Sequence, residues 1–130
     1  MEFGQFFNKQ FTYALVGATI DKTKYGYIVL KNLAEAGFKV VGVNPKYKEI
    51  DNIPCYPALE LISPKPEVVV FVVPPAVGLG MLDQIKQLGI NKVWFQPGAE
   101  SDEVREKIKN LGLSGVVDGS CIMVCHPRFN

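Results

Sequence analysis

The chain has 130 residues and a mass of 14.4 kDa, the length of one domain that can bury a sizeable core. Hydrophobic residues make up 48% and charged residues 21% of it, which excludes compositional disorder. Lysine and arginine total 14 against 13 aspartates and glutamates, so the net charge of +1 lacks the basic excess typical of a nucleic-acid binder. A small anionic ligand is still compatible with this balance, because a local cluster of lysines is enough to bind one.

Targeting signals and cysteine usage indicate the compartment. Residues 1–10 hold three phenylalanines but no continuous apolar stretch and no small-residue cleavage site, so they do not resemble a signal peptide. The longest apolar run, 68–73, is too short to cross a bilayer. Three cysteines argue against a secreted disulfide scaffold. We expect a cytoplasmic protein that binds no membrane, with a single domain over 1–130 of which 1–11 form an N-terminal extension.

The first half of the chain predicts two strands and one helix. An apolar strand is expected at 12–16 and a second, Val-rich strand at 39–43, with no strict alternation because both faces are covered. Between them, apolar residues at helical spacing predict a helix over 25–36 that a glycine ends. The segment 44–66 contains five prolines and is expected to be irregular, apart from a short turn at 58–62.

The second half predicts three more strands, at 68–73, 92–95 and 115–117. A helix is expected from Pro75 to Gly89, and another from an N-cap at Ser101 to Gly112. Five strands alternating with helices or crossovers predict an α/β fold with a doubly wound, mainly parallel sheet and helices on both faces.

Ligands of such a sheet bind beyond the carboxyl ends of its strands, so the loops there are the candidate site. The loop after the first strand holds Gly17, Ala18 and Thr19, and four lysines lie on the first two such loops: Lys22, Lys24, Lys46 and Lys48. Small residues and a hydroxyl at a helix N-terminus, with lysines beside them, suit a phosphate. The alternative is a tight turn with ordinary surface lysines.

The sequence argues against a dinucleotide site of the usual kind. The fingerprint G-x-G-x-x-G requires three glycines, and only Gly17 matches, with Thr19 and Lys22 at the other two positions. The acidic residue that would hold the ribose hydroxyls after the second strand is replaced by Asn44.

Taken together, the loop sequences resemble the family of stand-alone CoA-binding domains, relatives of the CoA-binding domain in the succinyl-CoA synthetase alpha subunit. The resemblance covers about 12–121, and its segments occur in order: Val16-Gly17-Ala18-Thr19, Tyr25 at a helix start, Val41-Gly42-Val43-Asn44-Pro45-Lys46, Val73-Pro74-Pro75, Val93-Trp94-Phe95-Gln96-Pro97-Gly98, and Val117-Asp118 with Cys121. Two local features depart from the family pattern: Gly119-Ser120 stands where an arginine is more usual, and the loop after Thr19 is rich in lysine.

The resemblance implies a Rossmann-like fold that binds coenzyme A in an extended groove. The diphosphate would lie over 17–19 beside Tyr25, the nucleotide would be lined by 44–46, the adenine would pack against 73–75, and the pantetheine would pass 96–98. The residues expected to bind the cofactor are Gly17, Ala18, Thr19, Lys24, Tyr25, Asn44, Pro45, Lys46, Val73, Pro74, Pro75, Gln96, Pro97 and Gly98.

The C-terminal C-x-x-x-C-H segment is expected to hold no metal and no catalytic group. A zinc site needs four ligands, and besides Cys121, Cys125 and His126 only Cys55 is available. His126 stands near an end of the chain that we expect to fray, without an evident serine or carboxylate partner. A redox pair of Cys121 and Cys125 is an alternative, because a helix would place them one turn apart. Idle thiols are the simpler interpretation.

We therefore expect a protein that binds coenzyme A or an acyl-CoA and has no catalytic activity of its own. One alternative is a non-catalytic subunit of an acyl-CoA-handling enzyme whose catalytic groups lie on a partner chain. The other is an NAD(P)- or nucleotide-binding regulator, although the sequence has no helix-turn-helix and no basic recognition helix. No motif identifies a protein partner.

Overall fold

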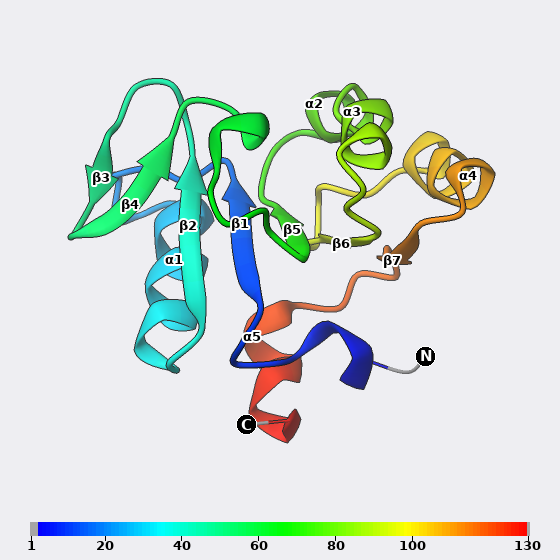
Figure 1. Cartoon of the computed structure of the whole chain (residues 1–130). Coiled ribbons are helices and arrows are strands. Elements are labelled where there is room, and N and C mark those ends of the chain that lie inside the picture. Colours follow the sequence, from blue (N-terminus) through cyan, green and yellow to red (C-terminus); the bar gives the residue numbers. More distant parts are fainter. Residues whose placement is uncertain (1–2, 130) are drawn as a thin grey trace.

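The computed structural model describes residues 3–129 and is an α/β fold with a Rossmann-like sheet of seven strands (Figure 1). Along the sheet the order is β3-β4-β2-β1-β5-β6-β7, and all pairs are parallel except β3 with β4. The strands are β1 (Thr12–Val16), β2 (Lys39–Val43), β3 (Glu49–Ile50), β4 (Ile53–Tyr56), β5 (Val68–Phe71), β6 (Lys92–Phe95) and β7 (Ser114–Val116).

Helices cover both faces of the sheet, as the sequence predicts. Strand β1 is buried throughout and shares its side chains between two cores: Tyr13 and Leu15 pack toward one layer, Ala14 and Val16 toward the other. The first layer contains α1 (Tyr25–Glu35) and α5 (Ile122–Cys125), and the second contains α3 (Leu82–Gln87) and α4 (Asp102–Leu111), with α2 (Pro75–Leu79) on the same side. Within the described residues, no helix is long and apolar enough to cross a membrane.

The expectation of five strands is wrong, because the segment 44–66 contributes two more. Strands β3 and β4 form a hairpin whose two turn residues, Asp51 and Asn52, have φ angles of 49° and 67°. A two-residue turn with both residues at positive φ is the preferred hairpin connection, and Asp and Asn tolerate that conformation. The prolines of this segment suggested irregular structure, and the hairpin was therefore not predicted. One of them, Pro54, lies within β4, the strand that pairs with both β2 and β3.

Several other boundaries also differ from the expectations. The expected helix over 75–89 is two helices, α2 and α3, separated by Gly80 and Met81, and Gly78 and Gly80 together weaken the helix there. Strand β5 ends at Phe71 rather than at 73, which frees Val72 and Val73 for the strand-end loop. The helix expected to end at 36 ends at Glu35, and the last strand lies one residue earlier, at 114–116.

Both ends of the described chain pack against the core. Trp94 is fully buried and lies beneath Phe3, Phe6 and Phe7, with ring centroids 5.3–5.5 Å apart. Residues 3–11 of the expected extension therefore form part of the core's cover, whereas 1–2 lie outside the described residues. The expected fraying near His126 is wrong, because its side chain is 4% exposed and its Nε2 lies 2.7 Å from Oδ1 of Asn32.

The turn that follows β1 lies in close contact with three other elements. Gly17 has a φ of +100°, and a Cβ there would overlap the carbonyl oxygen of Val72 just beyond β5. A Cβ on Gly26, in the first turn of α1, would overlap the carbonyl oxygen of Gly17. On the β2 side, a Cβ on Gly42 would lie 2.8 Å from the Cβ of Ala18. Three glycines therefore allow this turn to pack closely against its neighbours, two of them through backbone contacts.

Replacing Gly17 with alanine is expected to destabilise the protein more than the same replacement at Gly119. Both glycines have a positive φ, +100° and +86°, so each variant carries about 1–2 kcal/mol of backbone strain. At Gly17 the new methyl group also overlaps a carbonyl oxygen, which adds about 1–3 kcal/mol. At Gly119 no described atom lies within 4 Å of it. Urea denaturation measures both losses in unfolding free energy, and equal losses would contradict this packing.

Candidate functional site

A groove lies at the carboxyl ends of the parallel strands, around the point where the strand order reverses. The chain runs from β1 outward through β2 and β4, and then returns to start β5 on the other side of β1. This reversal opens the crevice in which doubly wound sheets bind their ligands. The groove has three hollows, which we call the loop hollow, the proline hollow and the Cys121 hollow, and Val72 lines all three.

The loop hollow is the largest, with a volume of about 780 Å³. It lies between the loop after β1, the start of α1 and the loop after β2. Its lining residues are Gly17, Thr19, Ile20, Asp21, Thr23, Lys24, Tyr25, Gly26, Asn44, Lys46, Tyr47 and Val72.

Internal hydrogen bonds hold the loop after β1 in shape. Asp21 accepts hydrogen bonds on Oδ1 from the backbone N–H of Thr23 at 3.0 Å and from its hydroxyl at 2.7 Å. The hydroxyl of Thr19 accepts one from the backbone N–H of Asp21 at 3.2 Å, so its own proton can still be donated to a ligand. The Thr23 hydroxyl, more than any other group, lowers the pKa of Asp21, and this carboxylate is therefore charged at neutral pH.

The N-terminus of α1 supplies positive potential to the loop hollow. Its N-cap residue, Lys24, makes no side-chain capping hydrogen bond, and its backbone carbonyl accepts from the N–H groups of Tyr27 and Ile28. The backbone N–H groups of Tyr25 and Gly26 are therefore the ones available to an anion at the start of this 11-residue helix. The exposed side chains of Lys24 and Lys46 also line this hollow, against the one carboxylate of Asp21 among its lining residues. Backbone N–H groups, a hydroxyl and two ammonium groups together suit a phosphate ligand.

Asn44 connects the two loops that border this hollow. Its Nδ2 donates a hydrogen bond to the carbonyl oxygen of Ala18 at 2.9 Å, and its Oδ1 accepts one from the backbone N–H of Lys46, also at 2.9 Å. The Asn44 amide therefore fixes Lys46 relative to the loop after β1. Asn44 also lines the loop hollow, and its contact with a nucleotide stays a prediction.

The proline hollow lies on the α2 side of the groove and has a volume of about 450 Å³. It is mostly apolar and contains no charged side chain. Its lining residues are Val72, Val73, Pro74, Pro75, Pro97, Gly98 and Ala99. An apolar lining of this kind suits an uncharged ring.

The Cys121 hollow lies on the α1 and α5 side and has a volume of about 290 Å³. Gln96, which is 4% exposed, organises it: Oε1 accepts a hydrogen bond from the backbone N–H of Ile122 at 2.7 Å, and Nε2 donates one to Sγ of Cys121 at 3.2 Å. The lining residues are Tyr25, Val72, Gln96, Pro97, Cys121 and Met123.

Comparison with known proteins decides the family. Residues 11–127 match the family described as CoA binding domain. The chain belongs to this family. Every residue that lines the three hollows falls within the matched range.

Several relatives of this CoA-binding domain are whole chains of similar length. A conserved hypothetical protein from Pyrococcus furiosus is 45% identical, with a TM-score of 0.82 over 87% of this chain and 97% of its own. A hypothetical protein from Pyrococcus horikoshii is 37% identical, with a TM-score of 0.82 over 90% of this chain and 82% of its own.

Larger relatives match over only part of their length. An ADP-forming acetate–CoA ligase from Methanocaldococcus jannaschii is 27% identical over 124 residues, which is 90% of this chain and 18% of the ligase. The chain therefore spans less than a fifth of the length of the curated relatives that it matches.

The groove of this CoA-binding domain brings together all but two of the residues expected from the sequence. Ala18 is fully buried and Pro45 is exposed, and neither lines a hollow. The sequence interpretation missed other lining residues, namely Ile20, Asp21, Thr23, Gly26, Tyr47, Val72, Ala99, Cys121 and Met123. The D-x-T spacing of Asp21 and Thr23 is a local turn signal that could have indicated the lining residues between 20 and 23.

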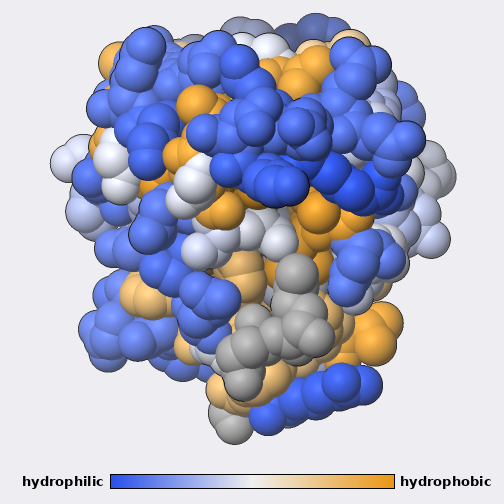
Figure 2. All heavy atoms as spheres, turned by 90° about the vertical axis from the view of Figure 1, so that its right-hand side faces the viewer, coloured by the Kyte–Doolittle hydropathy of each residue, from blue (hydrophilic) through white to orange (hydrophobic). Residues whose placement is uncertain are grey.

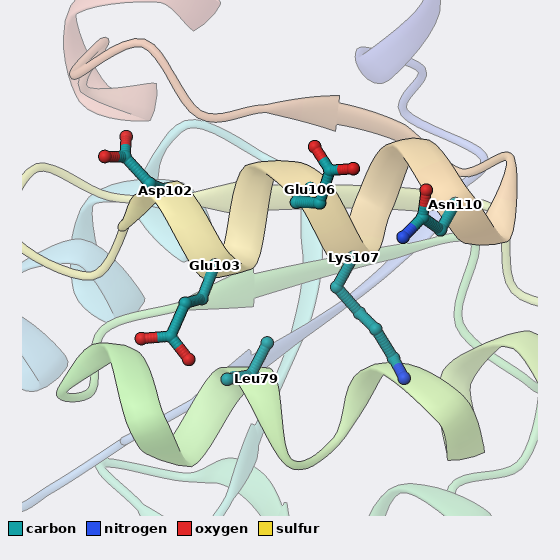
Figure 3. A pocket seen from close by; sticks show the side chains of 6 residues that line it. All are labelled: Leu79, Asp102, Glu103, Glu106, Lys107 and Asn110. Atoms are coloured by element: carbon teal, nitrogen blue, oxygen red, sulfur yellow. The ribbon is translucent and has the colours of Figure 1, made fainter.

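A further depression, between α4 and α2, is unsuited to coenzyme A. It is lined by Leu79, Asp102, Glu103, Glu106, Lys107 and Asn110, as Figure 3 shows. Three carboxylates stand against one lysine, and that lysine pairs with Asp83 at 3.2 Å. A phosphate would be repelled there. On the side of the molecule that carries α4, the upper part of Figure 2 is mainly hydrophilic, with hydrophobic residues exposed in places between the hydrophilic ones.

The three thiols differ in their surroundings. Cys55 and Cys125 are 7% and 6% exposed, and burial raises the pKa of each above its usual value. Cys121 is partly exposed and lines a hollow, and it is the N-cap residue of the short helix that ends at Cys125. All three are free thiols, and a redox role for the pair Cys121 and Cys125 stays a prediction. The described residues contain no cluster of three metal-ligating side chains.

Alkylation by iodoacetamide is expected to modify Cys121 before Cys55 and Cys125. The thiolate is the reacting form, and a raised pKa leaves the two buried thiols with less thiolate at pH 7 than an ordinary cysteine. Their modification should therefore accelerate only as the pH approaches the raised values. Peptide mass spectrometry over time at pH 7 and pH 9 measures the three rates. Faster modification of Cys125 than of Cys121 at pH 7 would contradict this assignment.

Proposed function

We propose that the protein binds coenzyme A in this groove, with its diphosphate in the loop hollow, and performs no chemistry by itself. The observation that carries the proposal is the shape of the groove in a chain of the CoA binding domain family: a phosphate-compatible hollow continues into two hollows without charged side chains. The adenine would pack in the proline hollow, and the pantetheine would pass Pro97 toward Cys121.

The 3′-phosphate of coenzyme A would meet Lys46. The loop after β2 faces the ribose of a nucleotide in this type of fold. Asn44 fixes the backbone of Lys46 by a hydrogen bond, and no carboxylate precedes Glu49 on this loop. An ammonium group suits the phosphate of coenzyme A, whereas the free ribose hydroxyls of NAD are bound best by a carboxylate.

The positions of the acid–base side chains support the proposal that the protein performs no chemistry by itself. The single histidine, His126, is buried beside Asn32 and lines none of the three hollows. Asp21 is the one carboxylate that lines them, and it accepts two hydrogen bonds from Thr23 within its own loop. A nucleophile with an activating base is therefore lacking among the described groove residues.

A second candidate function is that of the CoA-binding part of a larger ligase, with catalytic groups on a partner chain. The observation that favours it is the partial match to an ADP-forming acetate–CoA ligase. Turnover assays for thioester formation, with the purified chain alone and with partner chains from the same cell, separate this candidate from a stand-alone binding protein. Turnover that appears only with a partner would support the second candidate.

Coenzyme A is expected to raise the melting temperature more than equimolar dephospho-CoA, and NAD is expected to raise it little. The contact between Lys46 and the 3′-phosphate should contribute about 1.5–3 kcal/mol, or roughly ten- to a hundredfold in affinity. Lys46→Ala should narrow the gap between coenzyme A and dephospho-CoA and change the response to dephospho-CoA little. Thermal denaturation with each ligand measures these shifts.

Lys48→Ala provides the matched control, because Lys48 is exposed on the same loop and does not line the groove. This variant should respond to all three ligands as the unmodified protein does. Equal shifts from NAD and coenzyme A would contradict the proposed function. Equal shifts from coenzyme A and dephospho-CoA would contradict only the role of Lys46.

A further inference from the structure

We propose that the Cys121 hollow receives the acyl end of a short, uncharged acyl-CoA and discriminates against acyl groups that carry a carboxylate. This inference rests on the proposed function, because it takes the diphosphate to lie in the loop hollow. The two hollows share Tyr25 and Val72, so a ligand anchored in the first can continue directly into the second.

The size of the Cys121 hollow fits a terminal group rather than a nucleotide. Its volume is about 290 Å³, against about 780 Å³ for the loop hollow and about 450 Å³ for the proline hollow. The two larger hollows suffice for the diphosphate and the adenosine. The smallest hollow is then left for the end of the pantetheine arm that passes Pro97, together with the thiol and a chain of a few carbons.

The lining of the Cys121 hollow is uncharged. Val72, Pro97 and Met123 present hydrocarbon and a thioether, and the ring of Tyr25 adds an apolar face. Met123 can adjust its shape to acyl chains of slightly different length, since its side chain is unbranched and flexible. Tyr25 is 64% exposed, so the hollow can be reached from solvent.

One polar group that lines the hollow, the amide of Gln96, has a donor to spare for a thioester carbonyl. The amide nitrogen of Gln96 carries two hydrogens, of which one is donated to Sγ of Cys121. Because the oxygen of the same amide accepts from Ile122 at 2.7 Å, the side chain is held in one orientation. Its second N–H can therefore be donated to an acyl oxygen without rearrangement.

A carboxylate on the acyl group would find no ionic partner in this hollow. The two lysines of the groove, Lys24 and Lys46, line the loop hollow and not the Cys121 hollow. An unpaired carboxylate in an apolar site loses solvation that nothing there replaces. The geometry therefore favours acetyl to butyryl groups over succinyl or malonyl groups.

Isothermal titration calorimetry with coenzyme A, butyryl-CoA and succinyl-CoA tests the inference. Butyryl-CoA is expected to bind at least as tightly as coenzyme A, and succinyl-CoA about tenfold more weakly than butyryl-CoA, as expected for an unpaired polar group. Equal affinities for butyryl-CoA and succinyl-CoA would overturn the inference, as would a tenfold loss for butyryl-CoA relative to coenzyme A. Failure of coenzyme A itself to bind would instead contradict the proposed function, and with it this inference.

Two substitutions at Met123 sharpen the test. Met123→Lys introduces a cation into the hollow and should bring succinyl-CoA to at least the affinity of butyryl-CoA, whereas Met123→Leu should keep the original order. An unchanged order in Met123→Lys would overturn the placement of the acyl group. If the lysine variant does not fold, the comparison of the three ligands in the unmodified protein still decides the inference.

Discussion

The approach of the turn after β1 to the end of β5 is the constraint on which the groove depends. A side chain on Gly17 would overlap the carbonyl oxygen of Val72, and one on Gly26 would overlap the carbonyl oxygen of Gly17. The N-terminus of α1 is therefore held against the turn, and the turn against β5. Because Val72 lines all three hollows, this contact also determines where they meet. Gly17 is therefore needed for the packing of the protein, whether or not a ligand is bound.

Charge is distributed unevenly along the groove, and this matches a ligand with a charged and an uncharged part. Lys24, Lys46 and the N-terminal end of α1 border the loop hollow, while the other two hollows lack charged side chains. Coenzyme A has the same division, with its phosphates at the nucleotide end and an uncharged pantetheine. Asn44 lines the charged part of the groove and Gln96 an uncharged part, and hydrogen bonds to backbone or thiol partners hold each of the two amides in place.

The sequence predicted those elements whose signals are local. The N-cap hydrogen bond from the backbone N–H of Val104 to Ser101 and the left-handed Gly112 that ends α4 both follow from residue type and spacing. The edge hairpin was missed although its turn residues favour it, because prolines nearby suggested irregular structure. The split between α2 and α3 follows from two glycines within three residues, a weak signal beside a helical apolar pattern.

Most of the candidate site that lies on the strand-end loops was predictable from the sequence, whereas several residues that reach it through packing between elements were not. The loops after β1 and β2 were recognised from small residues and lysines, and they border the loop hollow as expected. The contributions of Val72, Cys121 and Met123 depend on strand order and on how the last helix packs against α1, which no local pattern encodes. The positioning role of Asn44 likewise becomes visible only when two loops meet in space.

Amide chemical shifts recorded during titration with coenzyme A test the location of the site most directly. The account predicts the largest shifts at the amides of Gly17, Thr19, Lys46, Val72 and Cys121, with small changes along α4. Shifts concentrated at Glu103, Glu106 and Lys107, around the depression between α4 and α2, with an unperturbed loop after β1, would contradict it.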